Sequence, residues 1–260
     1  MTRGSGDAMR MAVAGGTGVV GRLVVERARA AGHEVVVISR SHGVDLTTGA
    51  GLDEALTEVS AVIDVSNIAT LNRSVAIRFF EATTRTLLDA EQRCGVGHHV
   101  VLSIVGVDRV GLGYYQAKRR QEDLVLTGPV PATVLRATQF FEFAIQSLTR
   151  FPGPVAVVPR MRTQPVAAVE VATELVRLAE EPAVGRAADL AGPEVMMMSS
   201  AARRVATVRG PHKVVLTGPW PSAAGRSMAS GGLLPTGPGP RGTLRFDEWL
   251  ADTTETDTTR

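Results

Sequence analysis

A cluster of glycines between residues 15 and 21 constrains the fold more than any other feature of this sequence. An apolar run begins at Met11, ends in these glycines and is followed by a long helical pattern. Gly16, Gly18 and Gly21 fit the spacing G-x-G-x-x-G, and Gly15 fits the related spacing G-x-x-G-x-x-G with the last two. Glycines at such positions permit a tight turn and leave no Cβ between the backbone and a pyrophosphate.

The context of this motif predicts a dinucleotide-binding loop. A strand pattern precedes it, a helix pattern follows it, and a second strand pattern lies further on, which is the arrangement that gives the motif its meaning. The N-terminus of the helix would then face the phosphates. The alternative is a glycine-rich turn that binds nothing. The predicted cofactor contacts in this loop are Gly15, Gly16, Thr17, Gly18, Val19, Val20 and Gly21.

Apolar runs alternate with helical patterns along the first half of the chain, which predicts an α/β fold. We expect a Rossmann-type doubly wound parallel sheet with a small C-terminal substrate lobe. The predicted strands are Arg10–Ala14, Glu34–Ile38, Val44–Leu46, Val59–Val65, His98–Ser103 and Ala132–Arg136, and the predicted helices between them are Val19–Ala31, Leu52–Glu58, Asn72–Cys94 and Arg119–Leu126.

The pattern predicts a division of the chain into four parts. Residues 1–8 and 251–260 are polar tails that we expect to be disordered. Residues 9–138 would form the NAD(P)-binding domain, and 139–250 a smaller lobe with a late strand near 188–191 that returns to the main sheet. Many glycines and prolines in Pro211–Gly242 predict loop there. The lobe's predicted helices are Phe140–Leu148, Val169–Ala179, Ala201–Val208 and Phe246–Leu250.

The composition argues for a small-molecule partner. The net charge is +2, too small to favour nucleic acid or an anionic membrane. No apolar run approaches the roughly 18 residues that span a bilayer, and the first residues contain no apolar signal-peptide core. We therefore expect a cytoplasmic protein; the sequence leaves its oligomeric state open.

The sequence does not predict a metal site. Cys94 is the only cysteine, which excludes an internal disulfide and a cysteine-built metal site. His98 and His99 are neighbours in a predicted strand, so their side chains should point to opposite faces of the sheet and cannot share one ion.

The turn after the second strand favours NADP over NAD. Folds that bind NAD place an acidic residue there, on the ribose hydroxyls, but this chain has Ser39 and Arg40. Arg40 can pair with a 2′-phosphate, with Ser39 or Ser41 as a further donor. The alternative is an arginine in a solvated turn. Asp45 and Leu46 would approach the adenine, unless Asp45 only begins a turn, and Asn67 would lie at the carboxyl edge of the sheet.

A tyrosine and a lysine suggest acid–base chemistry. Tyr114 and Lys118 are four residues apart, so they share one face of a helix. An ammonium beside a phenol lowers the pKa of the phenol. Such a tyrosine can exchange a proton with a substrate oxygen while a hydride moves to or from a nicotinamide. Ser103, at the end of the fifth predicted strand, can orient the same oxygen.

The chain resembles the short-chain dehydrogenase/reductase superfamily, in its atypical, NmrA-like branch. The resemblance covers nearly the whole chain apart from the two tails. It implies a Rossmann-type NADP-binding domain, a small C-terminal lobe that closes over the substrate, and a lysine that also holds the nicotinamide ribose hydroxyls. The segments that carry it are Gly15–Gly21, Ser39–Arg40, Gly95–Ser103, Tyr114–Lys118, Leu135–Phe143, Gln164–Val166 and Val169–Ala172.

Two departures from the family pattern leave alternatives open. The interval from Ser103 to Tyr114 is shorter than in most catalytic members, and Tyr115 competes with Tyr114 as the proton donor. The first hypothesis is an NADP-dependent oxidoreductase, with NAD as a possible cofactor, that acts on a small apolar carbonyl, enone or quinone-like substrate. The second is a non-catalytic NADP sensor that binds a protein partner, as some members of the branch do.

Overall fold

The computed structural model describes residues 8–149, 152–210 and 213–257 of the 260-residue chain. Contacts divide the chain into two compact units, which we describe separately. The first unit consists of residues 1–103, 116–135 and 171–187, and the second of residues 104–115, 136–170 and 188–260.

The first unit is built on a six-stranded parallel sheet with the strand order β2-β1-β3-β4-β5-β8. Because β2 pairs on one side of β1 and β3 on the other, the sheet winds outward in both directions from its first strand. This topology confirms the predicted Rossmann-type α/β fold. The strands are β1 (Arg10–Ala14), β2 (Glu34–Ile38), β3 (Ala61–Asp64), β4 (His98–Ile104), β5 (Ala132–Ala137) and β8 (Gly185–Arg186).

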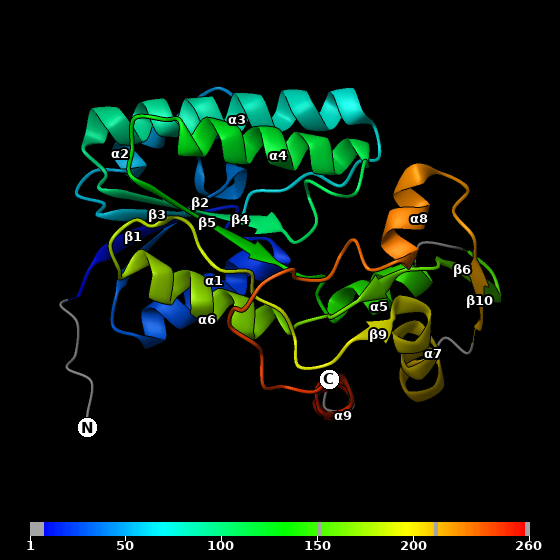
Figure 1. Ribbon diagram of the computed structural model, residues 1–260. Coiled ribbons are helices and arrows are strands. Elements are labelled where there is room, and N and C mark those ends of the chain that lie inside the picture. Colours follow the sequence, from blue (N-terminus) through cyan, green and yellow to red (C-terminus); the bar gives the residue numbers. More distant parts are fainter. Residues whose placement is uncertain (1–7, 150–151, 211–212, 258–260) are drawn as a thin grey trace. The chain divides into compact units, whose positions relative to one another are not determined.

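Helices cover both faces of this sheet (Figure 1). The helices α3 (Arg73–Cys94) and α4 (Gly113–Leu126) lie over one face, and α1 (Val19–Ala30) and α6 (Ala168–Ala179) over the other. Because both faces are covered, β1 and β3 are almost wholly buried and are apolar except for Arg10 at the start of β1 and Asp64 at the end of β3.

The long helix α3 has clear sequence signals at both of its ends. Asn72 caps its N-terminus by accepting a hydrogen bond from the Val75 N–H, and Gly95, with φ of +73°, ends it.

The adjacent histidines at the start of β4 lie on opposite faces of the sheet, as predicted. The Nε2 atom of His98 is 2.9 Å from the Thr133 hydroxyl of β5. The Nδ1 atom of His99 is 2.8 Å from the Glu91 carboxylate of α3, and both of these side chains are fully buried. The two imidazoles therefore serve separate contacts inside the first unit.

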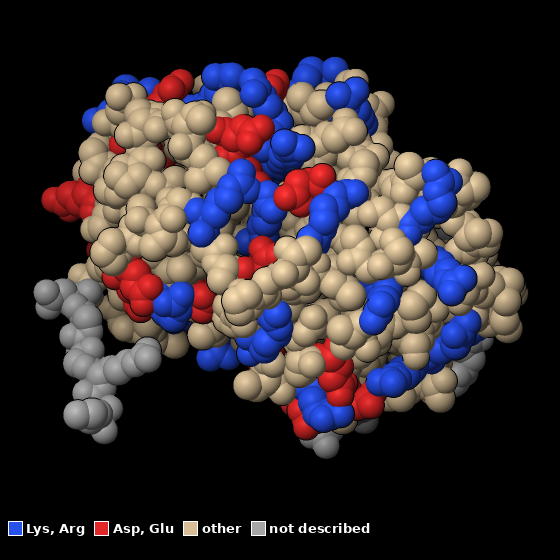
Figure 2. All heavy atoms as spheres, viewed as in Figure 1, with Lys and Arg blue, Asp and Glu red and all other residues tan. Residues whose placement is uncertain are grey.

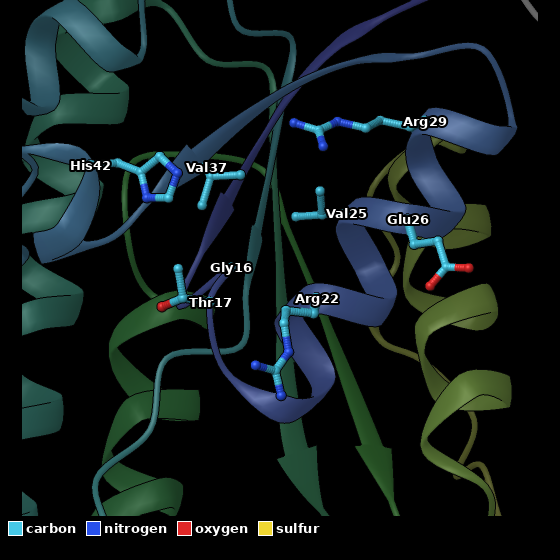
Figure 3. A pocket seen from close by; sticks show the side chains of 8 residues that line it. All are labelled: Gly16, Thr17, Arg22, Val25, Glu26, Arg29, Val37 and His42. Carbon is cyan, nitrogen blue, oxygen red and sulfur yellow. The ribbon is translucent and has the colours of Figure 1, made fainter. Parts of the chain in front are cut away.

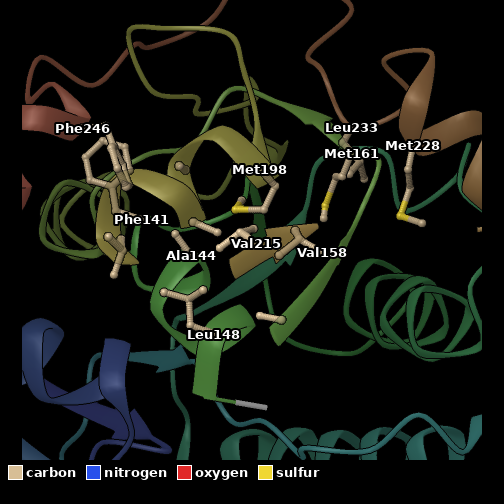
Figure 4. Close-up of a cluster of buried hydrophobic side chains, with 14 of the residues drawn as sticks. Phe141, Ala144, Leu148, Val158, Met161, Met198, Val215, Met228, Leu233 and Phe246 are labelled. Atoms are coloured by element: carbon tan, nitrogen blue, oxygen red, sulfur yellow. The ribbon is translucent and has the colours of Figure 1, made fainter. Parts of the chain in front are cut away.

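The second unit encloses its own hydrophobic core (Figure 4). Phe141, Phe246 and Met198 are almost fully buried in it, and the Phe141 and Phe246 rings meet edge to face at 5.2 Å. Two small sheets, parallel β6–β10 and antiparallel β7–β9, border this core. The elements are α5 (Glu142–Thr149), β6 (Val155–Pro159), β7 (Arg162–Thr163), β9 (Met196–Met197), α7 (Met198–Arg209), β10 (Val214–Gly218), α8 (Ala223–Ala229) and α9 (Phe246–Asp257).

The structure corrects two sequence predictions. Val44–Leu46 is a turn and not a strand, because the Asp45 carboxylate accepts hydrogen bonds from both the N–H and the hydroxyl of Thr47. Pro211–Gly242 is mostly loop, as predicted, although it also contains β10 and α8. The expected disorder of 251–260 is wrong for its first part, because α9 continues to Asp257.

Two further predictions concern a strand that lies elsewhere in the structure and tails that lie partly outside the described residues. The late strand predicted near 188–191 lies earlier, as β8, and only Leu190 of that segment bridges to β5, at Ala137. Residues 1–7 of the predicted N-terminal tail, and 258–260 of the C-terminal one, lie outside the described residues.

The surface carries charges of both signs. Basic and acidic side chains are interspersed on the face shown in Figure 2. Among the residues that the structure describes, no helix is both long enough and apolar enough to cross a membrane.

Candidate functional site

The glycine-rich loop follows β1 directly and packs against the end of β3. Gly15 has φ of +77°, and a Cβ there would lie 2.9 Å from backbone atoms of Ser66. A Cβ at Gly21 would lie only 2.1 Å from the Gly15 carbonyl oxygen. These two glycines are therefore required by the close packing of loop, helix and strand.

Gly18 differs from its neighbours because it has space around it. A Cβ at Gly18 would contact only the Gly15 oxygen, at 3.2 Å. Gly18 is the N-cap of α1, no side chain caps the helix there, and its first turn holds no acidic residue. The first N–H groups of α1 have no acceptor within the helix, and the helix dipole favours an anion at this end. The loop thus has the backbone geometry of a phosphate cradle.

A pocket with a volume of about 560 Å³ lies beside this loop (Figure 3). Its apolar lining is formed by Val25 of α1 and Val37 of β2, next to Gly16. The polar side chains around it carry mostly positive charge. These polar residues are Thr17, Arg22, Glu26, Arg29 and His42.

The turn after β2 forms a short 3₁₀ helix, Arg40–His42, held by side-chain hydrogen bonds. The Ser39 hydroxyl lies 2.8 Å from Nδ1 of His42 and 3.0 Å from the Ser41 hydroxyl. Arg40 is exposed and does not line the pocket. Hydrogen bonds from Thr47 chiefly lower the pKa of Asp45, and the Arg40 charge adds to this effect.

Sequence reasoning missed six of the eight residues that line this pocket, and two of the six, Arg22 and His42, are basic residues next to predicted contacts. Arg22 follows the last glycine of the motif directly, and His42 ends the segment that begins with Ser39. Both positions were visible as basic residues next to predicted cofactor contacts, but the pattern did not show that their side chains line the same hollow as Gly16. Leu46, a predicted adenine contact, packs at the margin of the first unit's core.

The segment after β3 is ordered by its own side chains. The buried Asp64 carboxylate accepts a 2.8 Å hydrogen bond from the Ser66 N–H, and the Asn67 side chain accepts one of 2.7 Å from the Ile68 N–H. This segment follows the strand next to β1, so Asn67 comes from the carboxyl edge of the sheet, as predicted.

Lys118 is buried in the first unit, where several groups hold its ammonium. Its Nζ donates to the Leu102 carbonyl at 2.7 Å and to the Gln121 side chain at 2.5 Å, and it lies 4.8 Å from the centre of the Phe80 ring. Burial lowers the pKa of Lys118 to about 8, although the carboxylates of Asp64 and Glu122 oppose this shift.

Ser103 is also engaged inside the first unit. Its hydroxyl donates to the Glu122 carboxylate at 2.5 Å, and the second oxygen of Glu122 accepts from Arg186 at 2.8 Å. A hydroxyl has one hydrogen to donate. Ser103 can therefore donate to another oxygen only after it leaves Glu122.

Tyr114 and Tyr115 belong to the second unit. The Tyr115 hydroxyl accepts a 3.4 Å hydrogen bond from Gln139, and burial raises the pKa of Tyr115 to about 12. Burial, and to a lesser degree the neighbouring Tyr115, raises the pKa of Tyr114 as well. The pKa of Tyr114 is therefore raised, which is opposite to the predicted direction.

Among the described residues, no group of three His, Cys, Asp or Glu side chains is placed to hold a metal ion.

Comparison with known families identifies the segment that contains the glycine loop. Residues 11–112 match the model of the NAD dependent epimerase/dehydratase family. No curated protein sequence matches the chain.

The chain is similar in fold to solved structures of nucleotide-dependent enzymes. One is an NADPH-dependent quinone oxidoreductase from Escherichia coli complexed with NADPH (TM-score 0.68, 17% identity, covering 94% of this chain and 99% of that one). Another is the Citrobacter sp. triphenylmethane reductase complexed with NADP(H) (TM-score 0.64, 17% identity, covering 88% of this chain and 92% of that one). A third is the Thermus thermophilus UDP-glucose 4-epimerase complexed with NAD (TM-score 0.66, 19% identity, covering 94% of this chain and 93% of that one).

The family match over residues 11–112 and the shared fold agree with the predicted resemblance, whereas the NmrA-like branch stays a prediction. The cofactors named for these solved structures are NADPH, NADP(H) and NAD.

Proposed function

We propose that this protein is an NADP-dependent oxidoreductase that transfers a hydride to or from a small apolar carbonyl, enone or quinone-like substrate. The single observation that carries the proposal is the cradle made by the glycine loop and the uncapped N-terminus of α1. Close packing fixes Gly15 and Gly21, while Gly18 leaves open the space in which a pyrophosphate would lie. A bound nicotinamide nucleotide would supply or accept the hydride.

The preference for NADP rests on the basic side chains near this cradle. Arg40 follows β2 at the position where an acid would select NAD, with Ser39 beside it. Arg22 and His42 line the neighbouring pocket, so Arg22 would add positive charge on the side of the glycine loop and His42 would add a hydrogen-bonding group. Arginine can pair with phosphate through two parallel hydrogen bonds, so an arginine would be a stronger phosphate contact than His42.

Three side chains would serve the reaction. Lys118 would hold the ribose hydroxyls, Tyr114 would donate or accept the substrate proton, and Ser103 would steady the substrate oxygen after release from Glu122. The raised pKa of Tyr114 keeps its phenol protonated at neutral pH, which is the form that a reduction requires. Tyr115 is the weaker candidate because it is buried in the core of the second unit, whereas Tyr114 is only partly buried.

The proposed substrate class has two kinds of support. Quinone and triphenylmethane reductases are among the proteins of similar fold. In the second unit, Phe140 is partly buried and Phe143 is exposed, so both offer apolar surface, whereas Phe141 and Met198 are buried in the core.

The experiment is an assay of steady NADPH consumption with a panel of quinones, ketones and enones. We expect turnover with at least one class, and loss of that turnover in Tyr114→Phe. Tight NADPH binding without turnover on any of the three classes would overturn the oxidoreductase proposal.

One observation favours a second candidate, an NADP sensor that binds a protein partner. Lys118 and Ser103 are both committed to α4 side chains, Gln121 and Glu122, as expected of residues that stabilise a fold. The same assay separates the two candidates, because a sensor would bind NADPH and consume none.

A further inference from the structure

We propose that Gln121 is a positioning residue that ties Lys118 to the buried carboxylate of Asp64 and so keeps the lysine charged and fixed at the end of β4. The inference rests on the proposed function in one respect, since it gives Lys118 the task of holding the cofactor ribose. The contacts that carry it lie wholly within the first unit and do not depend on a bound cofactor.

A continuous chain of hydrogen bonds joins the three residues. The Gln121 Nε2 group donates to Oδ2 of Asp64 at 2.8 Å, and the Gln121 Oε1 atom accepts from Nζ of Lys118 at 2.5 Å. The donor end of the amide thus contacts the carboxylate of Asp64, and its acceptor end contacts the ammonium of Lys118. Lys118, Gln121 and Asp64 are at most 5% exposed, so water does not compete for these bonds.

The network explains how a charged lysine is tolerated in this interior. An ammonium removed from water strongly favours its neutral form unless charges and acceptors compensate it. The charged groups that act on Lys118 are Asp64 of β3 and Glu122 of α4. The Glu122 carboxylate accepts hydrogen bonds from Ser103 and Arg186. The hydrogen-bonded connection from Lys118 to a carboxylate therefore runs through Gln121 to Asp64.

The same contacts fix the direction of the lysine. Gln121 lies three residues after Lys118 on α4, while Leu102, the second acceptor, lies on β4. Phe80 of α3 covers the ammonium from a third direction. Of the two protein acceptors, the Leu102 carbonyl belongs to the backbone, so Gln121 is the acceptor that substitution can remove.

Lysine NMR tests the proposal directly, because the chain has only two lysines, Lys118 and Lys213. In protein labelled at lysine, the side-chain signals are followed against pH for the wild type and for Gln121→Met, which keeps the length of the side chain but has no amide. Gln116→Met, at an exposed glutamine on the same helix, is the matched control, and the Lys213 signal is an internal one. Circular dichroism checks the fold of each variant.

We expect the pKa of Lys118 to fall by about one to two units in Gln121→Met, the size expected when a hydrogen bond to a charged group is lost. Lys213 should not change, and Gln116→Met should match the wild type. Asp64→Asn, which removes the charge but little volume, should lower the pKa of Lys118 in the same direction. An unchanged Lys118 titration in both Gln121→Met and Asp64→Asn would overturn the proposal.

The cofactor gives a second readout that separates this inference from the proposed function. In Gln121→Met, the affinity for NADPH should decline at a lower pH than in the wild type, in step with the lysine. If the wild type binds neither NADPH nor NADH, the proposed function is wrong, and the NMR comparison still decides the role of Gln121.

Discussion

The Ser103 hydroxyl donates a 2.5 Å hydrogen bond to a carboxylate oxygen of Glu122, and both side chains are buried. This hydrogen bond should stabilise the fold, whether or not Ser103 also takes part in catalysis. Removal of the donor leaves a buried carboxylate oxygen without this bond, which costs about 1–3 kcal/mol. We expect Ser103→Ala to lower the free energy of unfolding by that amount in urea titrations, with Ser60→Ala, at an exposed serine, close to the wild type. An unchanged stability of Ser103→Ala would show that the bond contributes nothing.

The packing of the glycine loop predicts a large effect of a small substitution. A Cβ at Gly21 would lie 2.1 Å from the Gly15 oxygen and 2.7 Å from the Gly16 Cα. Since backbone must move to admit it, Gly21→Ala should cost about 1–3 kcal/mol or more, measured by thermal or urea unfolding. Gly97→Ala is the control, because its Cβ would meet the Ser60 oxygen at an ordinary 3.6 Å. Equal stability of the two variants would contradict this account of the loop.

The charged side chains near the glycine loop predict how substitutions change the binding of NADPH relative to NADH. A hydrogen bond to a charged group contributes about 1.5–3 kcal/mol, so Arg40→Ala should weaken NADPH binding roughly 10-fold or more and leave NADH nearly unchanged. Arg22→Ala should act in the same sense, since Arg22 lines the pocket that Arg40 does not reach. Glu26→Gln, which removes the one acid lining that pocket, should strengthen NADPH binding.

Titration calorimetry with both cofactors checks these effects. Losses of equal size for NADPH and NADH in the arginine variants, or a wild-type preference for NADH, would contradict the assignment of a 2′-phosphate to this region.

The buried pair of His99 and Glu91 predicts a pH-dependent stability. Burial alone would lower the pKa of His99, but the adjacent Glu91 carboxylate outweighs burial and raises it. A raised pKa means that the folded state binds the proton more tightly, so its contribution to stability is present below the ordinary histidine pKa of about 6.5 and is lost as the pH rises through the raised value.

The difference in unfolding free energy between the wild type and His99→Gln should therefore be larger at about pH 6 than at about pH 9. Denaturant titrations at the two pH values measure it, with His42→Gln as an exposed control. A difference that grows with pH would show that burial, and not Glu91, dominates the pKa of His99.

Much of the first unit could be predicted because its signals are local. Continuous apolar runs marked β1, β2 and β4, and the glycine spacing marked the loop before α1. The Val44–Leu46 prediction failed because its apolar residues resemble a strand, whereas the Asp45 carboxylate satisfies the Thr47 backbone and so closes a turn. In the second unit, β10 was missed because its pairing with β6 is a contact between distant segments that no local pattern records.

The candidate site divides in the same way. The glycine loop and Lys118 could be found from spacing alone. The partners of Lys118 and Ser103 could not, because Gln121 and Glu122 are ordinary helix residues until β3 and β4 are packed beneath them. The pKa of Tyr114 was predicted in the wrong direction for the same reason, since burial is a property of the fold and not of the Tyr-x-x-x-Lys spacing.

The measurement that tests the central claim most directly is titration of NADPH into the wild type and into Gly18→Val, with circular dichroism as a check on folding. The space around Gly18 admits a side chain with only the Gly15 oxygen close by, at 3.2 Å, so the variant should fold. Its branched side chain would occupy the place of the pyrophosphate. We predict that the wild type binds NADPH and that folded Gly18→Val does not; a folded variant that binds NADPH as the wild type does would contradict the assignment of the cofactor site.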